Sequence, residues 1–328
     1  MFFNTAEEAL ETIPLLLNRG IDVGELMDYM SLKSVKDKPG MPGYLQNVKE
    51  GEVALLTEVK ADDYKTMQKE ILELEEDLKQ LNIIFSSGFT DNTAEYKLLW
   101  NIRKGLLPTV GAIREQGTTL IIEDIAFPPQ NLSPGFTGLR KALDKHGYED
   151  SIIFGHALAG NLHFVFSQNF DDQIEVARYS AFINELTTMV VKDFDGSLKA
   201  EHGTGRNMAP FVEMEWGEFI YRIMEDIKTA FDPKQILNPG VILNNDPEIH
   251  LKNFKSTPVT NGIIDRCIEC GYCEPRCPSG ELTFTPRQRI RAWRDITAAK
   301  NAPDKQKLYN EYEKVFNYYG EATCAADG

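Results

Sequence analysis

Four cysteines lie close together in the last quarter of this 328-residue chain, and their spacing is typical of a cluster-binding loop. They occur in the segment CIECGYCEPRCP, with the pattern C-x2-C-x2-C-x3-C-P, as Cys267, Cys270, Cys273 and Cys277. Spacings of two residues let consecutive thiolates surround one iron–sulfur cubane from a single loop. In two-cluster ferredoxins the fourth cysteine of such a run serves the other cluster. We therefore expect a [4Fe-4S] cluster in this segment.

Zinc is the alternative metal for these thiolates. Four-cysteine zinc sites usually consist of two C-x2-C pairs separated by a long stretch, so the spacing favours iron and sulfide. The fifth cysteine, Cys324, resembles the first ligand of a second cluster run, although a stray cysteine is the other interpretation. Since the sequence ends before such a run is complete, we expect the cluster to be absent or partial after purification in air.

Histidines form a second group of possible ligands. His156 and His163 flank Gly160 in the segment GHALAGNLH, and Glu201 directly precedes His202 in EHGTGR. Seven residues apart on one straight strand, the first two histidines would face opposite sides, but a hairpin near Gly160 would let them converge. Taken alone, each histidine is more simply interpreted as a core or turn residue than as a metal ligand. Together, two imidazoles and one carboxylate make a three-ligand metal site that can polarise a substrate oxygen.

The apolar periodicity predicts an α+β domain in residues 1–243. We expect strands at 51–61, 82–89 and 118–128, a hairpin at 151–167, and helices at 5–18, 22–32, 61–81, 92–107, 132–147, 172–194 and 211–231. Asp62 or Asp63 is expected to cap the helix at 61–81, and Pro108 to end the helix at 92–107. Residues 244–262 are polar and marked by Pro and Asn, so they are expected to form a linker. The cysteine-bearing module then occupies 263–328.

The composition excludes several classes of protein. With 35 Lys+Arg against 50 Asp+Glu, the net charge is −15, which argues against a general nucleic-acid or anionic-membrane binder. A hydrophobic content of 42% excludes a largely disordered chain. No apolar run is long enough to span a membrane, and the acidic first segment is not a signal peptide. We expect a cytoplasmic protein, with peripheral attachment to a membrane as the alternative.

Three motifs together resemble a known family. The segments GHALAGNLHFVF, EHGTGRNMAP and FDPKQILNPG are similar to the C-terminal half of FAD-linked oxidases of the vanillyl-alcohol-oxidase type, and more narrowly to D-lactate, glycolate and D-2-hydroxyglutarate dehydrogenases. The cysteine run resembles the members that carry iron–sulfur clusters after the flavoprotein half. This resemblance implies a ferredoxin-like cap, an antiparallel sheet backed by helices, followed by a small, mainly helical iron–sulfur module. It also implies that FAD is held mainly by an N-terminal half that this chain lacks.

The resemblance further implies roles for individual residues. His202 would accept the substrate hydroxyl proton as hydride leaves for the flavin, and Asn238 would face the flavin. Arg103 would bind the substrate carboxylate, which suits a planar two-pronged donor, although a solvated helix arginine is the alternative. The ligands of a divalent Zn, Mn or Fe ion would be His156, His163 and Glu201.

The implied function is the oxidation of a small D-2-hydroxy acid, D-lactate or glycolate-like, to the 2-oxo acid. Electrons would pass from FAD through [4Fe-4S] clusters to a quinone or a redox protein. The fragment alone is expected to be inactive. Two alternatives remain from the sequence: a non-catalytic iron–sulfur subunit that docks on a separate flavoprotein, and a structural zinc domain.

A basic segment follows the cysteine run. It contains four arginines in TPRQRIRAWR: Arg287, Arg289, Arg291 and Arg294. At these spacings they cannot all share one helix face, so a solvated or intramolecularly paired segment is favoured over docking to an acidic patch on a partner.

Overall fold

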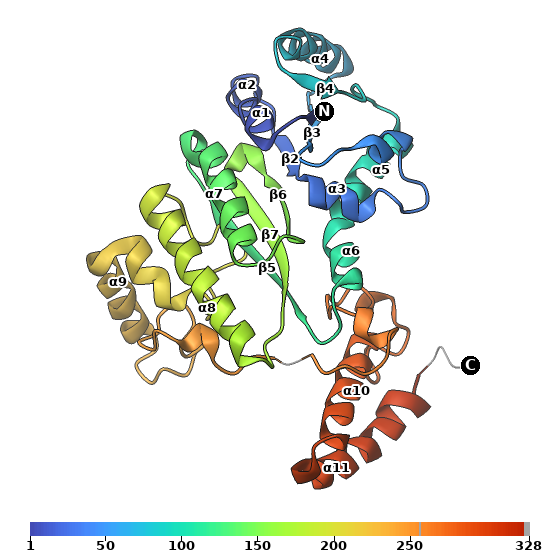
Figure 1. The fold of residues 1–328 in the computed structure, drawn as a ribbon, viewed down its shortest axis with the longest axis vertical. Helices are drawn as coiled ribbons and strands as arrows, with labels where there is room; N and C mark the ends of the chain where they lie inside the picture. The colour runs from blue at the N-terminus through green and yellow to red at the C-terminus, as the bar shows by residue number, and fades with distance from the viewer. Residues whose placement is uncertain (256, 325–328) are drawn as a thin grey trace. The chain divides into compact units, whose positions relative to one another are not determined.

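The computed structural model describes residues 1–255 and 257–324, which form two compact units (Figure 1). The first unit contains Met1–Leu106, Ile121–Phe166 and Gln173–Phe254. The second contains Leu107–Leu120, Ser167–Asp172 and the residues from Lys255 onward. The segment 244–262, predicted as a linker, is thus divided between the two units at residues 254 and 255.

A sheet runs through the first unit, and its described strands have the order β4-β1-β3-β2-β6-β7-β5. The strands are β1 (Phe2–Phe3), β2 (Val23–Met27), β3 (Val53–Glu58), β4 (Ile83–Phe85), β5 (Thr119–Ala126), β6 (Ile152–His156) and β7 (Asn161–Gln168). The pairs β1–β3, β1–β4, β2–β3, β2–β6 and β6–β7 are antiparallel. An antiparallel sheet combined with helices is therefore confirmed, while the finer ferredoxin-like description stays a prediction.

The first unit also contains helices that pack against this sheet. The second unit contains further helices. The helices are α1 (Ala6–Leu10), α2 (Ile13–Asn18), α3 (Tyr29–Val35), α4 (Tyr64–Leu78), α5 (Thr93–Lys104), α6 (Leu106–Ile113), α7 (Leu132–Lys145), α8 (Gln173–Thr188), α9 (Val212–Phe231), α10 (Pro286–Lys300) and α11 (Gln306–Phe316). In the core, the Phe182 ring of α8 lies 6.2 Å from Phe164 and 5.4 Å from Phe166 of β7, centroid to centroid. Aromatic packing of this kind holds the helical layer on the strands that carry the histidines.

The helix predicted at 22–32 is wrong. Its first half is β2, a central strand between β3 and β6, and its second half is α3. Asp28 separates the two, because one carboxylate oxygen accepts a hydrogen bond from the N–H of Ser31 (2.8 Å) and the other from the N–H of Ile153 (2.9 Å). Strand pairing on both sides overrides the local helical periodicity here.

The helix boundary predicted at Pro108 is also wrong. Helix α5 already ends at Lys104, with Gly105 as its C-cap, and α6 then begins at Leu106. Pro108 lies in the first turn of α6, where the missing N–H costs no helical hydrogen bond. The predicted cap of the helix at 61–81 is confirmed as Asp63, which accepts from the N–H of Thr66 at 3.0 Å.

In the second unit, α10 and α11 pack together, with the Trp293 and Phe316 rings 5.4 Å apart. Arg294 of α10 is 1% exposed and donates to the carbonyl oxygens of Ile264 and Cys267 at 3.1 and 2.8 Å. Its Nη1 also pairs with the Glu269 carboxylate at 3.0 Å. A buried arginine on α10 thus holds the first part of the cysteine loop.

The turn between β6 and β7 depends on Gly160. Its backbone is left-handed, with φ 70°, and its carbonyl oxygen accepts a hydrogen bond from Phe127 N–H at 2.9 Å. A Cβ atom at this position would lie 2.2 Å from the Phe127 carbonyl oxygen. Only glycine therefore permits both the turn and its close approach to the residue after β5.

We predict that Gly160→Ala destabilises the 1–328 chain far more than Gly20→Ala. Gly20 has almost the same φ, 69°, but a Cβ there would meet nothing within 4 Å. The control should cost about 1–2 kcal/mol for the left-handed backbone, and the clash at Gly160 should add roughly 1–3 kcal/mol. Urea denaturation of both variants measures the difference, and equal losses would mean that the close approach to Phe127 is not a constraint.

Candidate functional site

The hairpin of β6 and β7 brings two predicted ligands together. His156 ends β6, and His163 on β7 is the register partner of Phe154. The intervening turn covers Ala157–Ala159 and Gly160, so the chain reverses before β7 begins. The two imidazole rings lie 5.2 Å apart, almost perpendicular to one another. The convergence expected from the Gly160 hairpin is therefore present.

Glu201 completes this group. One of its oxygens, Oε1, lies 3.3 Å from Nε2 of His156 and 3.1 Å from Nε2 of His163. The ligand atoms of these three residues are all within 4.8 Å of one another. His163 is buried, whereas the Glu201 side chain is 51% exposed, so the group is open on the glutamate side. Its residues fit a three-ligand metal site with a position left for another ligand.

Glu25 on β2 orients the first of these histidines. Its side chain is 6% exposed, and its Oε1 accepts a hydrogen bond from Nδ1 of His156 at 2.6 Å. A neutral His156 then carries its lone pair on Nε2, the atom that faces the Glu201 oxygen. Two acceptor atoms facing each other at 3.3 Å repel unless a proton or a cation lies between them. The donor set thus fits a bound cation, and the carboxylate behind the histidine is a common support for a metal ligand.

The charges around Glu25 balance its burial. Burial would raise the pKa of this carboxyl, but the hydrogen bond with His156 and the charge of Arg103 outweigh it, so the pKa is lowered. In turn, the hydrogen bond with Glu25 raises the pKa of His156. Burial, with repulsion from His202 and His156, lowers the pKa of His163 to about 4. His163 is therefore neutral near pH 7, which is the form that binds metals.

Arg103 is held in the same network. Its Nε donates to Oε2 of Glu25 at 2.7 Å, and its guanidinium carbon lies 4.3 Å from the centroid of the Phe154 ring. The side chain is only 12% exposed, so it is not the solvated helix arginine that the sequence left open. Glu25 thus joins Arg103 to His156, and the arginine's terminal Nη groups are not used in that bond.

Asp124 holds the loop that carries Glu201 and His202. This buried carboxylate accepts three consecutive main-chain bonds at Oδ2, from the N–H groups of Ala200 (3.1 Å), Glu201 (2.6 Å) and His202 (3.1 Å). Burial would raise its pKa, but those amide bonds and the nearby positive charges lower it. Its other oxygen, Oδ1, is buried and has no hydrogen bond within the described residues. It lies 3.7 Å from both His202 Nδ1 and Lys199 Nζ.

His202 lies directly beside the three-residue group. Its ring stacks on that of His163, with centroids 4.8 Å apart, and its Nε2 is 3.9 Å from Glu201 Oε1. The side chain is 34% exposed. The residue predicted as a base therefore lies next to the predicted ligands, with one ring nitrogen toward Asp124 and the other toward Glu201.

Sequence reasoning assigned no role to Glu25 or Asp124. Glu25 was hidden because its segment was predicted as a helix, whereas the strand β2 places it opposite His156 in the β2–β6 register. Asp124 lies on β5, far from Glu201 along the chain, and only the tertiary fold brings them together. In the sequence, Glu123 and Asp124 of IIEDIAFP fit the pattern of the cluster-bearing members of the family it resembles, but that pattern gives Asp124 no role.

Asn238 lies apart from this network. It is an exposed residue with a left-handed φ of 42°, in the segment after α9. The turn before it is organised by Asp232, whose carboxylate accepts from the N–H groups of Ile236 and Leu237, each at 2.9 Å. No hydrogen bond within the described residues connects Asn238 to the histidines. Its role toward a flavin therefore stays a prediction.

The cysteines belong to the second unit. Cys270 and Cys273 are exposed, while Cys267, Cys277 and Cys324 are half-buried. The N–H of Glu269 lies 3.3 Å from the Cys267 sulfur. A hydrogen bond with Ser279 lowers the pKa of the Cys277 thiol. In the part of the chain that the structure describes, the groups with three ligand atoms within 4.8 Å contain no cysteine, so the thiols are not gathered around a single ion.

The arginines that follow the cysteines are paired within the chain. Arg287 Nε lies 3.0 Å from Glu274, Arg289 Nε donates to the Gly320 carbonyl at 2.6 Å, and Arg291 forms an ion pair with Asp295. Arg294 is buried, as described above. The intramolecular pairing favoured from the sequence is confirmed. No helix in the described residues has both the length and the apolar character needed to cross a membrane.

The comparisons of this chain with known proteins agree on one family. The family model for FAD linked oxidases, C-terminal domain, matches residues 1–242. A D-lactate dehydrogenase of Anaerostipes hadrus is 32% identical over 152 residues, which is 46% of this chain and 31% of that protein. A D-2-hydroxyglutarate dehydrogenase of Pantoea ananatis is 28% identical over 62% of this chain and 22% of its own length.

A third relative is a glycolate oxidase subunit of Bacillus subtilis, 27% identical over 68% of this chain and 45% of its own length. The chain thus spans less than half the length of each of these three relatives. The match to the family model includes every residue of the histidine–glutamate group and its two supporting carboxylates.

We predict that Asp124→Asn weakens Zn²⁺ binding by roughly 10- to 100-fold, the usual effect of removing a partner that orients a metal ligand. The neutral amide accepts more weakly from the three N–H groups that position Glu201 and His202. Calorimetric titration of the 1–328 chain with Zn²⁺ measures the change. Asp28→Asn is the matched control, because Asp28 is also a buried carboxylate that accepts two main-chain bonds, and its loss should leave the Zn²⁺ affinity unchanged.

Proposed function

Because the chain belongs to the FAD-linked oxidases through their C-terminal domain, we propose that it is the substrate- and metal-binding part of a D-2-hydroxy acid dehydrogenase. Its substrate would be a small acid such as D-lactate or glycolate, oxidised to the 2-oxo acid. The observation that carries this proposal is the convergence of His156 and His163 on one oxygen of Glu201, with His202 stacked beside them. The named activities of the relatives support the substrate class.

In this proposal His156, His163 and Glu201 hold a divalent Zn, Mn or Fe ion. The ion supplies a positive charge that makes the substrate hydroxyl more acidic when bound. Metal ligation needs neutral imidazoles. The pKa of His163 is lowered to about 4, whereas the pKa of His156 is raised by its bond to Glu25, so His156 would release the proton on Nε2 when the ion binds.

His202 accepts the hydroxyl proton at Nε2. Asp124 faces the other ring nitrogen, so its negative charge favours the imidazolium that forms when the proton arrives. Arg103 binds the substrate carboxylate through its terminal Nη groups, with its guanidinium held by Glu25 and Phe154. FAD would supply the acceptor for the hydride of the substrate's α-carbon when it is bound to the flavin-binding part of such an oxidase, and Asn238 would face it.

The second unit would carry a [4Fe-4S] cluster on Cys267, Cys270, Cys273 and Cys277, with Cys324 as a further ligand. The C-x2-C-x2-C-x3-C-P spacing and the exposure of Cys270 and Cys273 support this assignment. Electrons would leave through the cluster to a quinone or a redox protein. A purely non-catalytic iron–sulfur subunit would not need the buried network of Glu25, Asp124 and the histidines, so that alternative is less well supported.

We predict that His202→Asn lowers turnover by about 10²- to 10⁴-fold, the usual size of a general-base contribution. Asn keeps a polar side chain of similar size but cannot accept the proton at the Nε2 position. The assay needs the chain together with its flavin-binding part, a D-2-hydroxy acid and a dye as electron acceptor. Metal content should stay at the wild-type value, whereas His163→Ala should lose the metal. Turnover by His202→Asn equal to that of the wild type would contradict its role as the base.

A reciprocal pair of variants tests the two metal centres. After anaerobic reconstitution of the 1–328 chain with iron and sulfide, Cys270→Ser should lower acid-labile sulfide but leave Zn²⁺ binding at the histidines unchanged. His163→Ala should do the opposite, because the two sites use separate ligands. Elemental analysis and a sulfide assay give the result. Zinc without sulfide at the cysteines would instead support a structural zinc site.

A further inference from the structure

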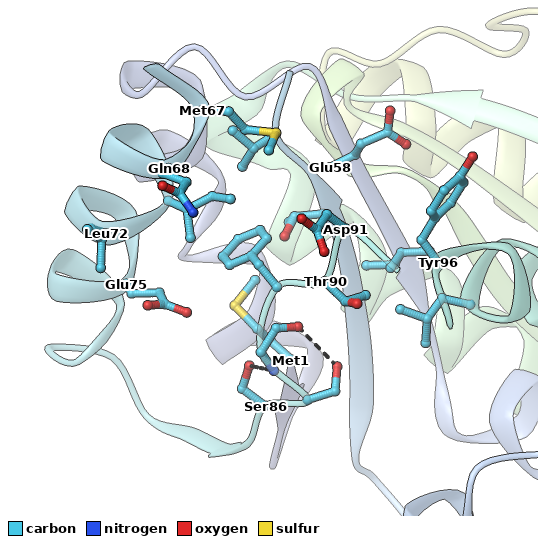
Figure 2. Close-up of a pocket in the computed structure, with 18 of the residues that line it drawn as sticks. Met1, Glu58, Met67, Gln68, Leu72, Glu75, Ser86, Thr90, Asp91 and Tyr96 are labelled. Atoms are coloured by element: carbon cyan, nitrogen blue, oxygen red, sulfur yellow. Dashed lines mark hydrogen bonds between the residues drawn. The ribbon is translucent and has the colours of Figure 1, made fainter. Parts of the chain in front are cut away.

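Charged side chains line a groove of about 740 Å³ in the first unit (Figure 2). Among its described lining residues they are Glu58, Glu75 and Asp91, and none of the three is buried. Charges that keep contact with water constrain a fold little. The charges beside the cysteine loop of the second unit, residues 267–277, are different, because one of them is fully buried and its partners lie on the loop itself.

Three of the four arginines on α10 face the cysteine loop. Arg287, Arg291 and Arg294 follow one another at spacings of four and three, so they share one face of the helix. Glu274 of the loop pairs with Arg287 at 3.0 Å. One oxygen of Glu269 lies 3.0 Å from Arg294 and 3.8 Å from Arg291. The arginine face of α10 therefore anchors the loop at two points.

Cys267 is held by two parts of the second unit. Its carbonyl oxygen accepts hydrogen bonds from Arg294 on α10, at 2.8 Å, and from Arg114, which directly follows α6, at 3.1 Å. The next residue, Ile268, packs against α6, since a Cβ atom added at Gly111 would lie 2.3 Å from its Cγ2 atom. The main chain at Cys267 is therefore fixed by protein contacts alone.

Glu269 turns the chain between Cys267 and Cys270. Its φ is 59°, a left-handed conformation that a residue other than glycine keeps only when its surroundings hold it there. Its carboxylate pairs with Arg294 and Lys255, and its N–H lies 3.3 Å from the sulfur of Cys267. The buried ion pair with Arg294 thus supports a turn that directs a donor to the first thiol of the loop.

The stretch from Cys270 to Cys273 lies between the two anchor points and is much less covered. Both cysteines are exposed, and Tyr272 between them is 69% exposed. Segments with few buried contacts rearrange at low free-energy cost, whereas packed and paired segments do not. The loop therefore combines one fixed cysteine, Cys267, with an exposed stretch that has room to move.

We propose that this loop is ordered before a cluster binds: Arg294 and Glu269 fix Cys267 as the first ligand, and residues 270–273 close on the cluster afterwards. Order that exists before binding removes an entropy cost from the binding step, so the arginine face of α10 would favour cluster assembly. Arg294 is then a positioning residue. The use of the loop rests on the cluster proposed for this unit, whereas its order in the metal-free chain does not.

Alkylation of the metal-free 1–328 chain tests the order of the loop. Limiting iodoacetamide is added under anaerobic, reducing conditions, and mass spectrometry of peptides gives the rate at each cysteine. Arg294→Lys keeps the charge but lacks the planar fork that reaches the Glu269 carboxylate and two carbonyl oxygens together. It should raise the rate at Cys267 about 10-fold and leave that at Cys273 unchanged, because only Cys267 loses its support.

Arg289→Lys is the matched control. Arg289 lies on the same helix but donates to the carbonyl oxygen of Gly320 instead of the loop, so this variant should leave both alkylation rates unchanged. Equal rates at Cys267 and Cys273 in the wild-type chain would overturn the proposal, since Cys267 would then not be held.

Glu269→Gln decides the question if Arg294→Lys unfolds the second unit, which circular dichroism would show as a loss of helix. Glutamine keeps the size of the side chain but not the charge that pairs with Arg294 and Lys255. It should raise the alkylation rate at Cys267 alone. A rate at Cys267 that stays at the wild-type value in Glu269→Gln and in a folded Arg294→Lys chain would overturn the proposal.

Reconstitution with iron and sulfide tests the use of that order. Acid-labile sulfide per chain, followed over time, should rise roughly 10-fold more slowly in the folded loop variant than in the wild type or Arg289→Lys. Equal rates would overturn the positioning role of Arg294. A wild-type chain that protects Cys267 from alkylation yet binds no sulfide would instead contradict the cluster proposed for this unit.

Discussion

The antiparallel register of β6 between β2 and β7 is the constraint on which the candidate site depends. On one side it sets Glu25 opposite His156, and on the other it sets Phe154 opposite His163. Because side chains alternate along a strand, a slip of one residue in either pairing would turn a histidine or the glutamate to the opposite face of the sheet. The Gly160 turn fixes the β6–β7 register, and its contact with Phe127 also ties the hairpin to the strand that carries Asp124.

Two buried carboxylates, Glu25 and Asp124, then set the charges around the histidines. A buried negative charge is costly unless it is paired and hydrogen-bonded. Glu25 meets this requirement with His156 and Arg103, and Asp124 meets it with three main-chain N–H groups. The oxygen of Asp124 that keeps no hydrogen bond in the described structure faces His202 and Lys199, each at 3.7 Å. Each carboxylate therefore supports a group proposed to act on the substrate, without being exposed to the substrate itself.

The second unit contains another buried charge that is paired and hydrogen-bonded. Arg294 is buried, pairs with Glu269 and donates to the carbonyl oxygens of Ile264 and Cys267, while Cys270 and Cys273 are exposed.

The sequence by itself determined which residues could do chemistry and most of the elements that carry them. Ligand spacing and apolar periodicity are local properties of a sequence. They therefore indicate the cysteine spacing, the histidine hairpin, the Glu201–His202 pair and the long helices without a structure. The tertiary structure alone decided that 23–27 is a strand, since its pairing with β3 and β6 outweighs a helical pattern. It also decided the roles of Glu25 and Asp124, whose partners lie 131 and 77 residues away in the bonds to His156 and Glu201. Contacts of that separation leave no local pattern, because they depend on how strands pair and not on neighbours in the chain.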